Sequence, residues 1–252
     1  MKEEIRRKIQ SCIAEYCEAR ELKRLWEEPI LKAADARNPL FGKLREIVEE
    51  GHHLPTDYLP EAATALSYFL PFRPGVAESN VGDGACSAVW ARAYLVTNAM
   101  AAWINEELAR FLRDRGWAAA VPTDAGMIGQ ENPRSRWSQR HVAYIAGHGT
   151  FGLNNMLISD AGCTGRYFSL VTALPIEPDE IVKAERCLYK KDGGCGVCVQ
   201  KCFPGALTFS GFDRFRCLEQ CLKNEALYEG ASVCGKCVVG VPCSFMKSSQ
   251  GI

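Results

Sequence analysis

Hydrophobic and polar residues alternate with helical spacing in several parts of the chain. Apolar residues recur at intervals of three to four between residues 2 and about 26, which predicts an amphipathic helix. The same spacing over 87–115 predicts the longest helix, and Gly116 is suited to end it. Shorter helices are predicted in PLFGKLREIVEEG, which Gly51 closes, and over 139–146, where Ser138 is a suitable cap.

Runs rich in β-branched and aromatic residues predict strands between these helices. EAATALSYFLPF predicts a central strand that Pro71 and Pro74 end, and WAAAVPTDAG predicts a strand that leads into a loop. NMLIS and RYFSLVTALPI predict two strands of a hairpin joined through DAGCTG, with Gly162 in the turn. After about residue 182 the chain becomes short-looped and rich in cysteine. We predict an α+β domain over residues 1–182 and a small metal-binding domain over 183–252.

Composition narrows the class of protein. The chain has 252 residues, of which 47% are hydrophobic, so it can bury a core of ordinary size. Lys+Arg and Asp+Glu are both 30, so no overall charge attracts nucleic acid or an anionic membrane. No apolar run is long enough to span a membrane, and the charged amino terminus lacks the apolar core of a secretory signal. We therefore expect a cytoplasmic protein with no membrane or nucleic-acid partner.

The cysteines are concentrated near the carboxyl end, where nine of the thirteen lie between Cys187 and Cys243. A reducing cytosol disfavours disulfides, so this concentration indicates metal ligation. Two-cluster ferredoxins use the motif C-x2-C-x2-C-x3-C-P. CGVCVQKCFPGAL retains the last three cysteines of this motif, with the proline one place late, and CGKCVVGVPC repeats the C-x2-C pair.

Crossed ligation, as in those ferredoxins, gives two sets of thiolates for two [4Fe–4S] clusters. One set is Cys187, Cys195, Cys198 and Cys243, and the other is Cys202, Cys234, Cys237 and either Cys217 or Cys221. Spacing alone does not choose between Cys217 and Cys221. Zinc and disulfides are the alternatives, but the interleaved spacings and the proline favour iron–sulfur clusters.

A glycine-rich segment, IAGHGTFGLNN, precedes the cysteines. Its three glycines match the string of a dinucleotide-binding turn, but LNNMLISDAG reaches a new turn too soon for the helix that such a site needs. The glycines either form a tight turn or let the backbone approach a flat ligand. Polar residues near these glycines favour a ligand; they are Arg140, His141, His148, Asn154 and Asn155. Tyr167 is a further candidate proton donor.

The segments SQRHVAYIAGHGTFGLNNMLIS and GRYFSLVTALPI, followed by the cysteines, resemble the epoxyqueuosine reductases and, more distantly, the reductive dehalogenases. The similarity spans most of residues 40–245. It implies a nitroreductase-like α+β domain that binds cobalamin, followed by a ferredoxin-like domain whose two clusters deliver electrons to the cobalt. The resemblance also favours Cys217 over Cys221 as a ligand. It would place the corrin or its nucleotide tail against Gly147, Gly149, Thr150, Gly152 and Asn154.

The sequence departs from that family in two respects. No helical-repeat region for transfer RNA follows the cysteines, so we do not expect modified tRNA as the substrate. The family's acidic residue has no match at equal spacing before Arg140, and Asp124 in VPTDAG is the residue that could take its role.

Three functions follow as hypotheses. The first is a reductase that passes electrons from two clusters to bound cobalamin for chemistry on an unidentified small molecule, supplied by an external low-potential electron donor. The second is an activator that reduces a partner corrinoid protein, and the third is a reductase that binds FMN instead. The candidate catalytic residues are Asp124, His141 and Tyr167, and the candidate cofactor-binding residues are Arg140, Gly147, His148, Gly149, Thr150, Gly152 and Asn154.

Overall fold

Residues 1–246 are described by the structure, which is a computed structural model. They divide into two units. The first unit comprises Met1–Leu70, Ala99–His148 and Arg166–Ile181, and the second comprises Pro71–Asn98, Gly149–Gly165 and the chain from Val182 onward. The second unit therefore contains two earlier segments in addition to the cysteine-rich segment.

A four-stranded sheet forms the centre of the first unit, in the order β1-β2-β6-β3. Its strands are β1 (Ile30–Asp35), β2 (Thr64–Pro71), β6 (Gly165–Thr172) and β3 (Ala119–Ala120). β1 runs antiparallel to β2, with Ile30 opposite Phe69. Every residue of β2 is buried, which explains why its sequence is an almost uninterrupted apolar run.

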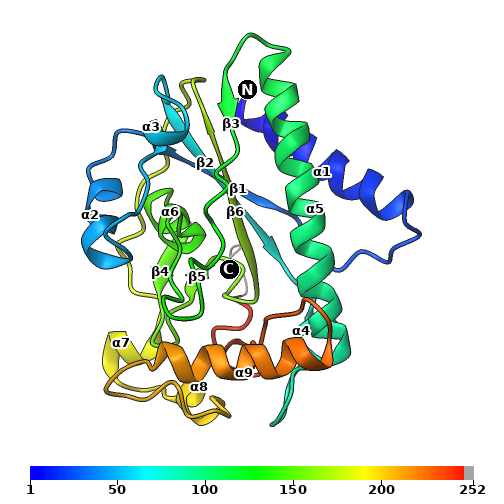
Figure 1. The fold of residues 1–252 in the computed structure, drawn as a ribbon, viewed down its shortest axis with the longest axis vertical. Coiled ribbons are helices and arrows are strands. Elements are labelled where there is room, and N and C mark those ends of the chain that lie inside the picture. Colours follow the sequence, from blue (N-terminus) through cyan, green and yellow to red (C-terminus); the bar gives the residue numbers. More distant parts are fainter. Residues whose placement is uncertain (247–252) are drawn as a thin grey trace, which may run out of the picture. The chain divides into compact units, whose positions relative to one another are not determined.

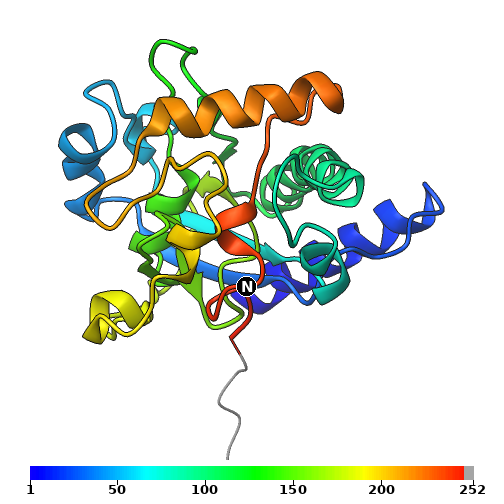
Figure 2. The ribbon, with the colours of Figure 1, turned by 90° about the horizontal axis from the view of Figure 1, so that it is seen from below.

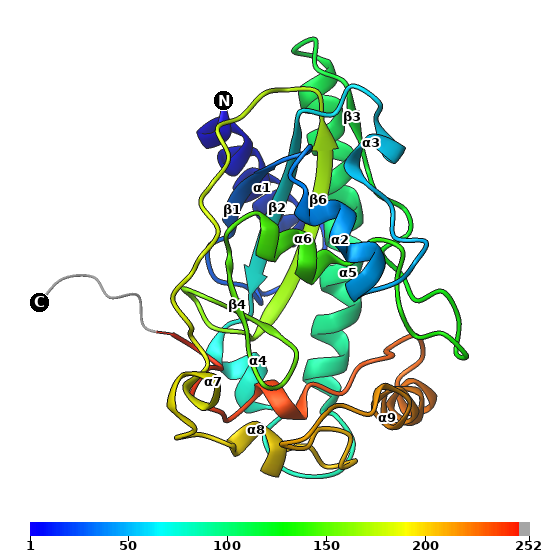
Figure 3. The same ribbon diagram turned by 90° about the vertical axis from the view of Figure 1, so that its left-hand side faces the viewer.

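Helices cover both faces of this sheet (Figures 1 and 3). On one face lie α1 (Lys2–Glu18) and the part of α5 (Ala88–Arg113) that follows Ala99, where the Tyr68 hydroxyl donates to the carbonyl of Ala101. On the other face lie α2 (Leu40–Ile47) and α6 (Gln139–Ile145), with the short α3 (Pro55–Tyr58) near one end of the sheet. Trp137 is fully buried there and stacks on Phe41, so its indole anchors this side of the core.

The second unit is built from short elements. β4 (Gly149–Phe151) pairs antiparallel with β5 (Leu157–Ser159). The helix α9 (Arg214–Leu227) starts at Asp213, whose side chain accepts from the Arg216 N–H. The turns α8 (Val197–Gln200) and η1 (Lys236–Val238) lie side by side, as Figure 2 shows in yellow and red. This unit also contains the short helices α4 (Pro74–Glu78) and α7 (Leu188–Asp192).

The structure confirms the α+β class and most of the predicted helices, but it corrects the first of them. The helix expected over 2–26 ends at Glu18. Glu21 adopts a positive φ of 49°, and the Leu22 N–H bonds back to the Cys17 carbonyl at 2.8 Å. This turn ends the helix although Leu22 and Leu25 continue its apolar spacing.

The predicted hairpin between NMLIS and RYFSLVTALPI is wrong. The turn forms, with the Ser159 N–H bonded to the Gly162 carbonyl, but β5 pairs with β4 while β6 belongs to the four-stranded sheet. β5 takes β4 as its partner because Gly149 has no side chain, and a Cβ there would overlap the Ile158 carbonyl. In the part of the chain that the structure describes, no helix is long and apolar enough to cross a bilayer.

Candidate metal centre

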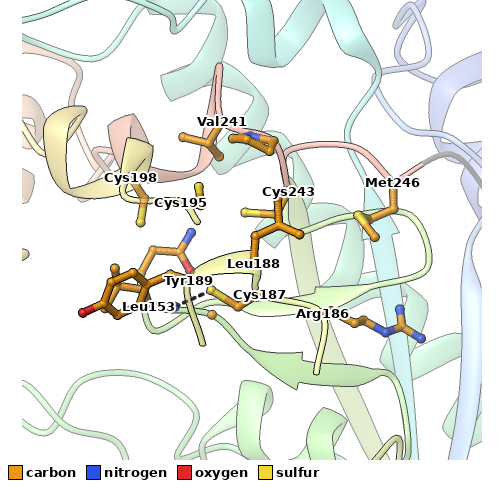
Figure 4. A pocket seen from close by; sticks show the side chains of 13 residues that line it. Leu153, Arg186, Cys187, Leu188, Tyr189, Cys195, Cys198, Val241, Cys243 and Met246 are labelled. Atoms are coloured by element: carbon orange, nitrogen blue, oxygen red, sulfur yellow. Dashed lines mark hydrogen bonds between the residues drawn. The ribbon is translucent and has the colours of Figure 1, made fainter. Parts of the chain in front are cut away.

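Four thiols of the second unit line one pocket together with Leu188 and Val241, and they come from three places in the chain. Cys187 precedes α7, Cys195 and Cys198 lie at α8, and Cys243 follows η1. Figure 4 shows their side chains directed toward a common space. Burial raises the pKa of the Cys198 thiol to about 11, and the neighbouring charges of Cys243, Cys187 and Cys195 add to the rise. We call these four residues the first thiol group.

A second thiol group gathers Cys202, Cys217, Cys234 and Cys237. Burial raises the pKa of Cys237 well above its usual range, and the charges of Cys234, Cys217 and Cys202 raise it further. Burial raises the pKa of Cys234 to about 11, with a further rise from Cys217 and Cys202. Cys202 thus lies near Cys234 and Cys237, and it also packs against the cluster of Cys198, Leu207 and Val241.

Both groups receive hydrogen bonds suited to thiolate sulfur. The backbone N–H of Leu153 donates to Cys187 Sγ at 3.4 Å, and that of Leu207 donates to Cys202 Sγ at 3.2 Å. Donors of this kind stabilise the anionic sulfur that metals require. The sulfurs are therefore held by backbone geometry and not only by side-chain packing.

All thirteen cysteines are unbridged, and none forms a disulfide. Within residues 1–246, no three His, Cys, Asp or Glu side chains come close enough together to hold a single metal ion.

Cys221 interacts with Cys217 on the same helix, α9. The side-chain hydrogen bond to Cys217 is the largest cause that raises the pKa of the Cys221 thiol far above its usual range, followed by burial. Cys221 therefore stays protonated at neutral pH in the metal-free chain.

The predicted cofactor-binding glycines are packed against the chain itself. Gly147 has a φ of 81°, and a Cβ at this position would overlap the carbonyl oxygen of Glu180. The Thr150 hydroxyl donates to Glu185 Oε1 at 3.0 Å, and Asn154 Nδ2 donates to the Cys237 carbonyl at 3.0 Å. A Cβ at Gly152 would lie 2.7 Å from Asn154 Oδ1. These contacts explain the residue types without a ligand, so contact with a cofactor stays a prediction.

The predicted catalytic residues lie in the first unit, in separate surroundings. Tyr58 donates from its hydroxyl to Asp124 Oδ2 at 3.1 Å, and His53 Nε2 lies 3.7 Å from the same oxygen. No pattern along the chain singled out Tyr58 or His53 as neighbours of Asp124. Because of burial and then the charge of Asp124, the pKa of Tyr58 rises well above its usual value, so the phenol stays protonated.

His141 is held by Ser138, whose Oγ lies 2.7 Å from its Nδ1. Burial, and then the charges of Arg140 and His52, lower the pKa of His141 to about 4, so its imidazole is neutral at physiological pH. His148 lies elsewhere: its Nε2 is 3.1 Å from the Ser67 carbonyl, and its ring meets Tyr167 edge to face at 5.3 Å. The structure thus brings His148 and Tyr167 together.

The fold of this chain is found in solved reductases. It superposes on the epoxyqueuosine reductase from Streptococcus thermophilus with a TM-score of 0.52 and 18% identity, covering 97% of this chain and 66% of the other. It matches an epoxyqueuosine reductase solved with a tRNA-Tyr epoxyqueuosine-modified stem loop with a TM-score of 0.50 and 19% identity, covering 84% and 56%. For the catabolic reductive dehalogenase NpRdhA the TM-score is 0.55 at 19% identity, covering 82% and 28%.

These matches confirm the predicted resemblance at the level of the fold. No family model and no curated protein matches the sequence. The chain spans between 56% and 66% of the length of the two epoxyqueuosine reductases above. Its own activity and substrate are therefore argued from its residues.

Proposed function

We propose that the chain is an iron–sulfur reductase that passes electrons from two [4Fe–4S] clusters to a bound corrinoid, for reductive chemistry on a small molecule. The observation that supports this proposal most is the gathering of eight cysteines in two groups of four. The groups match the two sets that crossed ligation of a two-cluster ferredoxin motif requires.

The spacing of the cysteines along the chain supports a cluster over zinc. The interleaved C-x2-C and C-x3-C spacings and the nearby proline follow the two-cluster ferredoxin motif more closely than the paired ligands of a zinc ribbon do. The donor set fits a cluster, because all eight ligands are thiols and backbone N–H groups support two of them.

In this proposal the first cluster is held by Cys187, Cys195, Cys198 and Cys243, and the second by Cys202, Cys217, Cys234 and Cys237. Bound clusters would supply one-electron transfer, and a bound corrinoid the low-valent cobalt chemistry that the resemblance implies. Leu188 and Val241 line the pocket of the first thiol group. An external low-potential donor would supply the electrons. We do not propose nucleic acid as a partner.

Among the candidate catalytic residues, Asp124 is best suited to move a proton. It already accepts a hydrogen bond from Tyr58 and lies near His53, so a proton can be exchanged at its carboxylate. His141 is less suited to act as an acid, because its lowered pKa leaves it unprotonated at neutral pH. Tyr167 is buried and stacks on Phe69 at 4.3 Å, an environment suited to packing.

The second candidate function is an activator that reduces a corrinoid held by a partner protein. It is supported by the glycine segment, where Thr150 and Asn154 already bind Glu185 and the Cys237 carbonyl. These side chains would have to exchange partners to bind a resident cofactor. We rank this function below the first, and the FMN-binding reductase below both.

One experiment separates the three functions. The chain, purified without oxygen, is reduced, mixed with cobalamin and passed over a desalting column. A reductase with its own corrinoid retains cobalamin and reduces it; Cys198→Ser abolishes the reduction and Cys17→Ser, outside both thiol groups, does not. Reduction without retention supports the activator. A released flavin, or no cobalamin reduction at all, contradicts the proposal.

A further inference from the structure

Lys236 is a buried lysine between two cysteines of the second thiol group, Cys234 and Cys237. Lys236 is only 4% exposed to solvent. Its Nζ donates to the Asn80 carbonyl at 3.1 Å. Within residues 1–246, no carboxylate forms an ion pair with it. A buried ammonium is costly unless an anion compensates it, so this position requires a negative charge that is not a carboxylate.

The ammonium is held firmly in place. Asn80 accepts from Lys236 through its carbonyl and donates from Nδ2 to the Cys234 carbonyl at 2.9 Å. Its Oδ1 accepts from the Ser87 N–H at 3.0 Å, which fixes the amide. The cation therefore cannot swing into solvent without breaking the contacts that hold the Cys234–Cys237 turn.

A second buried donor lies against the same turn. The indole of Trp90 packs on Gly235, and its Nε1 is a buried donor without a hydrogen-bond partner within residues 1–246. Buried indole N–H groups normally find an acceptor. Around one C-x2-C turn, the described residues thus leave Lys236 without an anionic partner and Trp90 Nε1 without an acceptor.

We infer that Lys236 is the counter-charge of the proposed second cluster and raises its reduction potential. This inference rests on the function proposed above. A cube with four thiolates is anionic, and reduction adds one more negative charge. A fixed cation in a poorly solvated site stabilises the reduced state more than the oxidised state. The charge therefore favours acceptance of an electron at this cluster.

Among the described residues, the first thiol group has no equivalent buried and unpaired cation. Arg186 lines its pocket, but this guanidinium pairs with Asp160 at 2.7 Å. Lys190 and Lys191 of α7 are exposed, so water screens their charges. We therefore expect the two clusters to differ in potential, with the second cluster the easier to reduce.

The test is an anaerobic redox titration of the full chain, followed by electron paramagnetic resonance, with iron content measured in parallel. Lys236→Gln removes the charge and keeps a polar group near Asn80. We expect the reduction equilibrium of one cluster to fall by about tenfold, which is about 59 mV for one electron. The other cluster should not move. Lys236→Arg should keep the wild-type potentials, and Lys191→Gln, an equal loss of charge at the surface, should leave both unchanged.

Each outcome separates this inference from the proposed function. Unchanged potentials in Lys236→Gln with full iron content overturn the inference and leave the clusters in place. Loss of one cluster in Lys236→Gln but not in Lys236→Arg supports a required counter-charge. Loss in both variants shows a packing role and overturns it. A wild-type chain without iron refutes the proposed function itself.

Discussion

The Sγ–H of Cys163 donates a hydrogen bond to Sγ of Cys243 over 3.8 Å. Cys163 lies just after the Ser159–Gly162 turn, and its backbone N–H also bonds the Cys243 carbonyl at 2.9 Å. The hydrogen bond from Cys163 lowers the pKa of the Cys243 thiol. Cys163, which lies outside the predicted cysteine motif, thus favours the thiolate form of a cysteine that is a proposed metal ligand.

Replacing Cys163 should therefore make Cys243 harder to ionise. In Cys163→Ala the donor is lost, and the pKa of Cys243 should rise. The measurement is the pH dependence of alkylation at Cys243 in the metal-free chain, resolved by peptide mass spectrometry. Cys163→Ser keeps a donor and should give a smaller shift. An identical alkylation profile in the wild type and Cys163→Ala would show that the contact does not act on Cys243.

Cys217 and Cys221 should differ as ligands. The interaction with Cys217, followed by burial, raises the pKa of the Cys221 thiol, so Cys221 stays protonated, and the resemblance to the epoxyqueuosine reductases favours Cys217 as the ligand. We expect Cys217→Ser to lose about half of the iron, since one of two clusters is lost, and Cys221→Ser to retain nearly all of it. Iron and acid-labile sulfide are measured on protein reconstituted without oxygen. The reverse pattern would assign the ligand to Cys221.

Gly147→Ala should destabilise the first unit. The residue has a φ of 81°, and an added Cβ would overlap the Glu180 carbonyl. Strain and overlap of this kind typically cost about 1–3 kcal/mol. Gly42→Ala is the matched control, because Gly42 lies in α2 with nothing near its Cβ position, and alanine there should stabilise by about 0.5–1 kcal/mol. Chemical denaturation of both variants tests this; equal stability would argue against the close packing at Gly147.

The stability of the chain should depend on pH through His141. Its pKa falls from 6.5 in the unfolded chain to about 4 in the folded chain. Between these values the unfolded chain binds more protons, so the free energy of unfolding decreases as the pH falls. The loss for this one group is about 3 kcal/mol between pH 6.5 and pH 4.

His141→Gln should flatten this part of the profile, measured by urea unfolding at several pH values. A smaller slope should remain, because burial also lowers the pKa of His52. A profile of His141→Gln that coincides with the wild type between pH 6.5 and 4 would show that His141 titrates normally in the folded chain.

Local sequence patterns predicted the helices that can pack against any apolar surface. The spacing over 87–115 predicted α5 because an apolar stripe needs only some core to face, and Ser138 correctly marked the start of α6. The pairing of β5 was missed because β4 lies within the glycine segment, where no β-branched run signals a strand. The pairing of β5 with β4 depends on the close approach of the Gly149 and Ile158 backbones, which the order of apolar and polar residues does not reveal.

The metal centre shows the same division. Spacing predicted the two sets of cysteines, because ligand spacing in a ferredoxin-like motif is a local property. Lys236 was not anticipated, since lysine is normally exposed. Its burial follows from Asn80, more than 150 positions earlier, which fixes the turn from another segment. The contact between Cys163 and Cys243 likewise joins distant segments, and no motif includes both residues.

The central claim is that eight thiolates hold two iron–sulfur cubes. The most direct measurement is a metal and sulfide inventory of the chain purified and reconstituted without oxygen, with Mössbauer spectroscopy to identify the iron. We predict about eight iron and eight sulfide per chain, all in cubane form. A chain that binds zinc instead, or that binds no iron, would contradict the account.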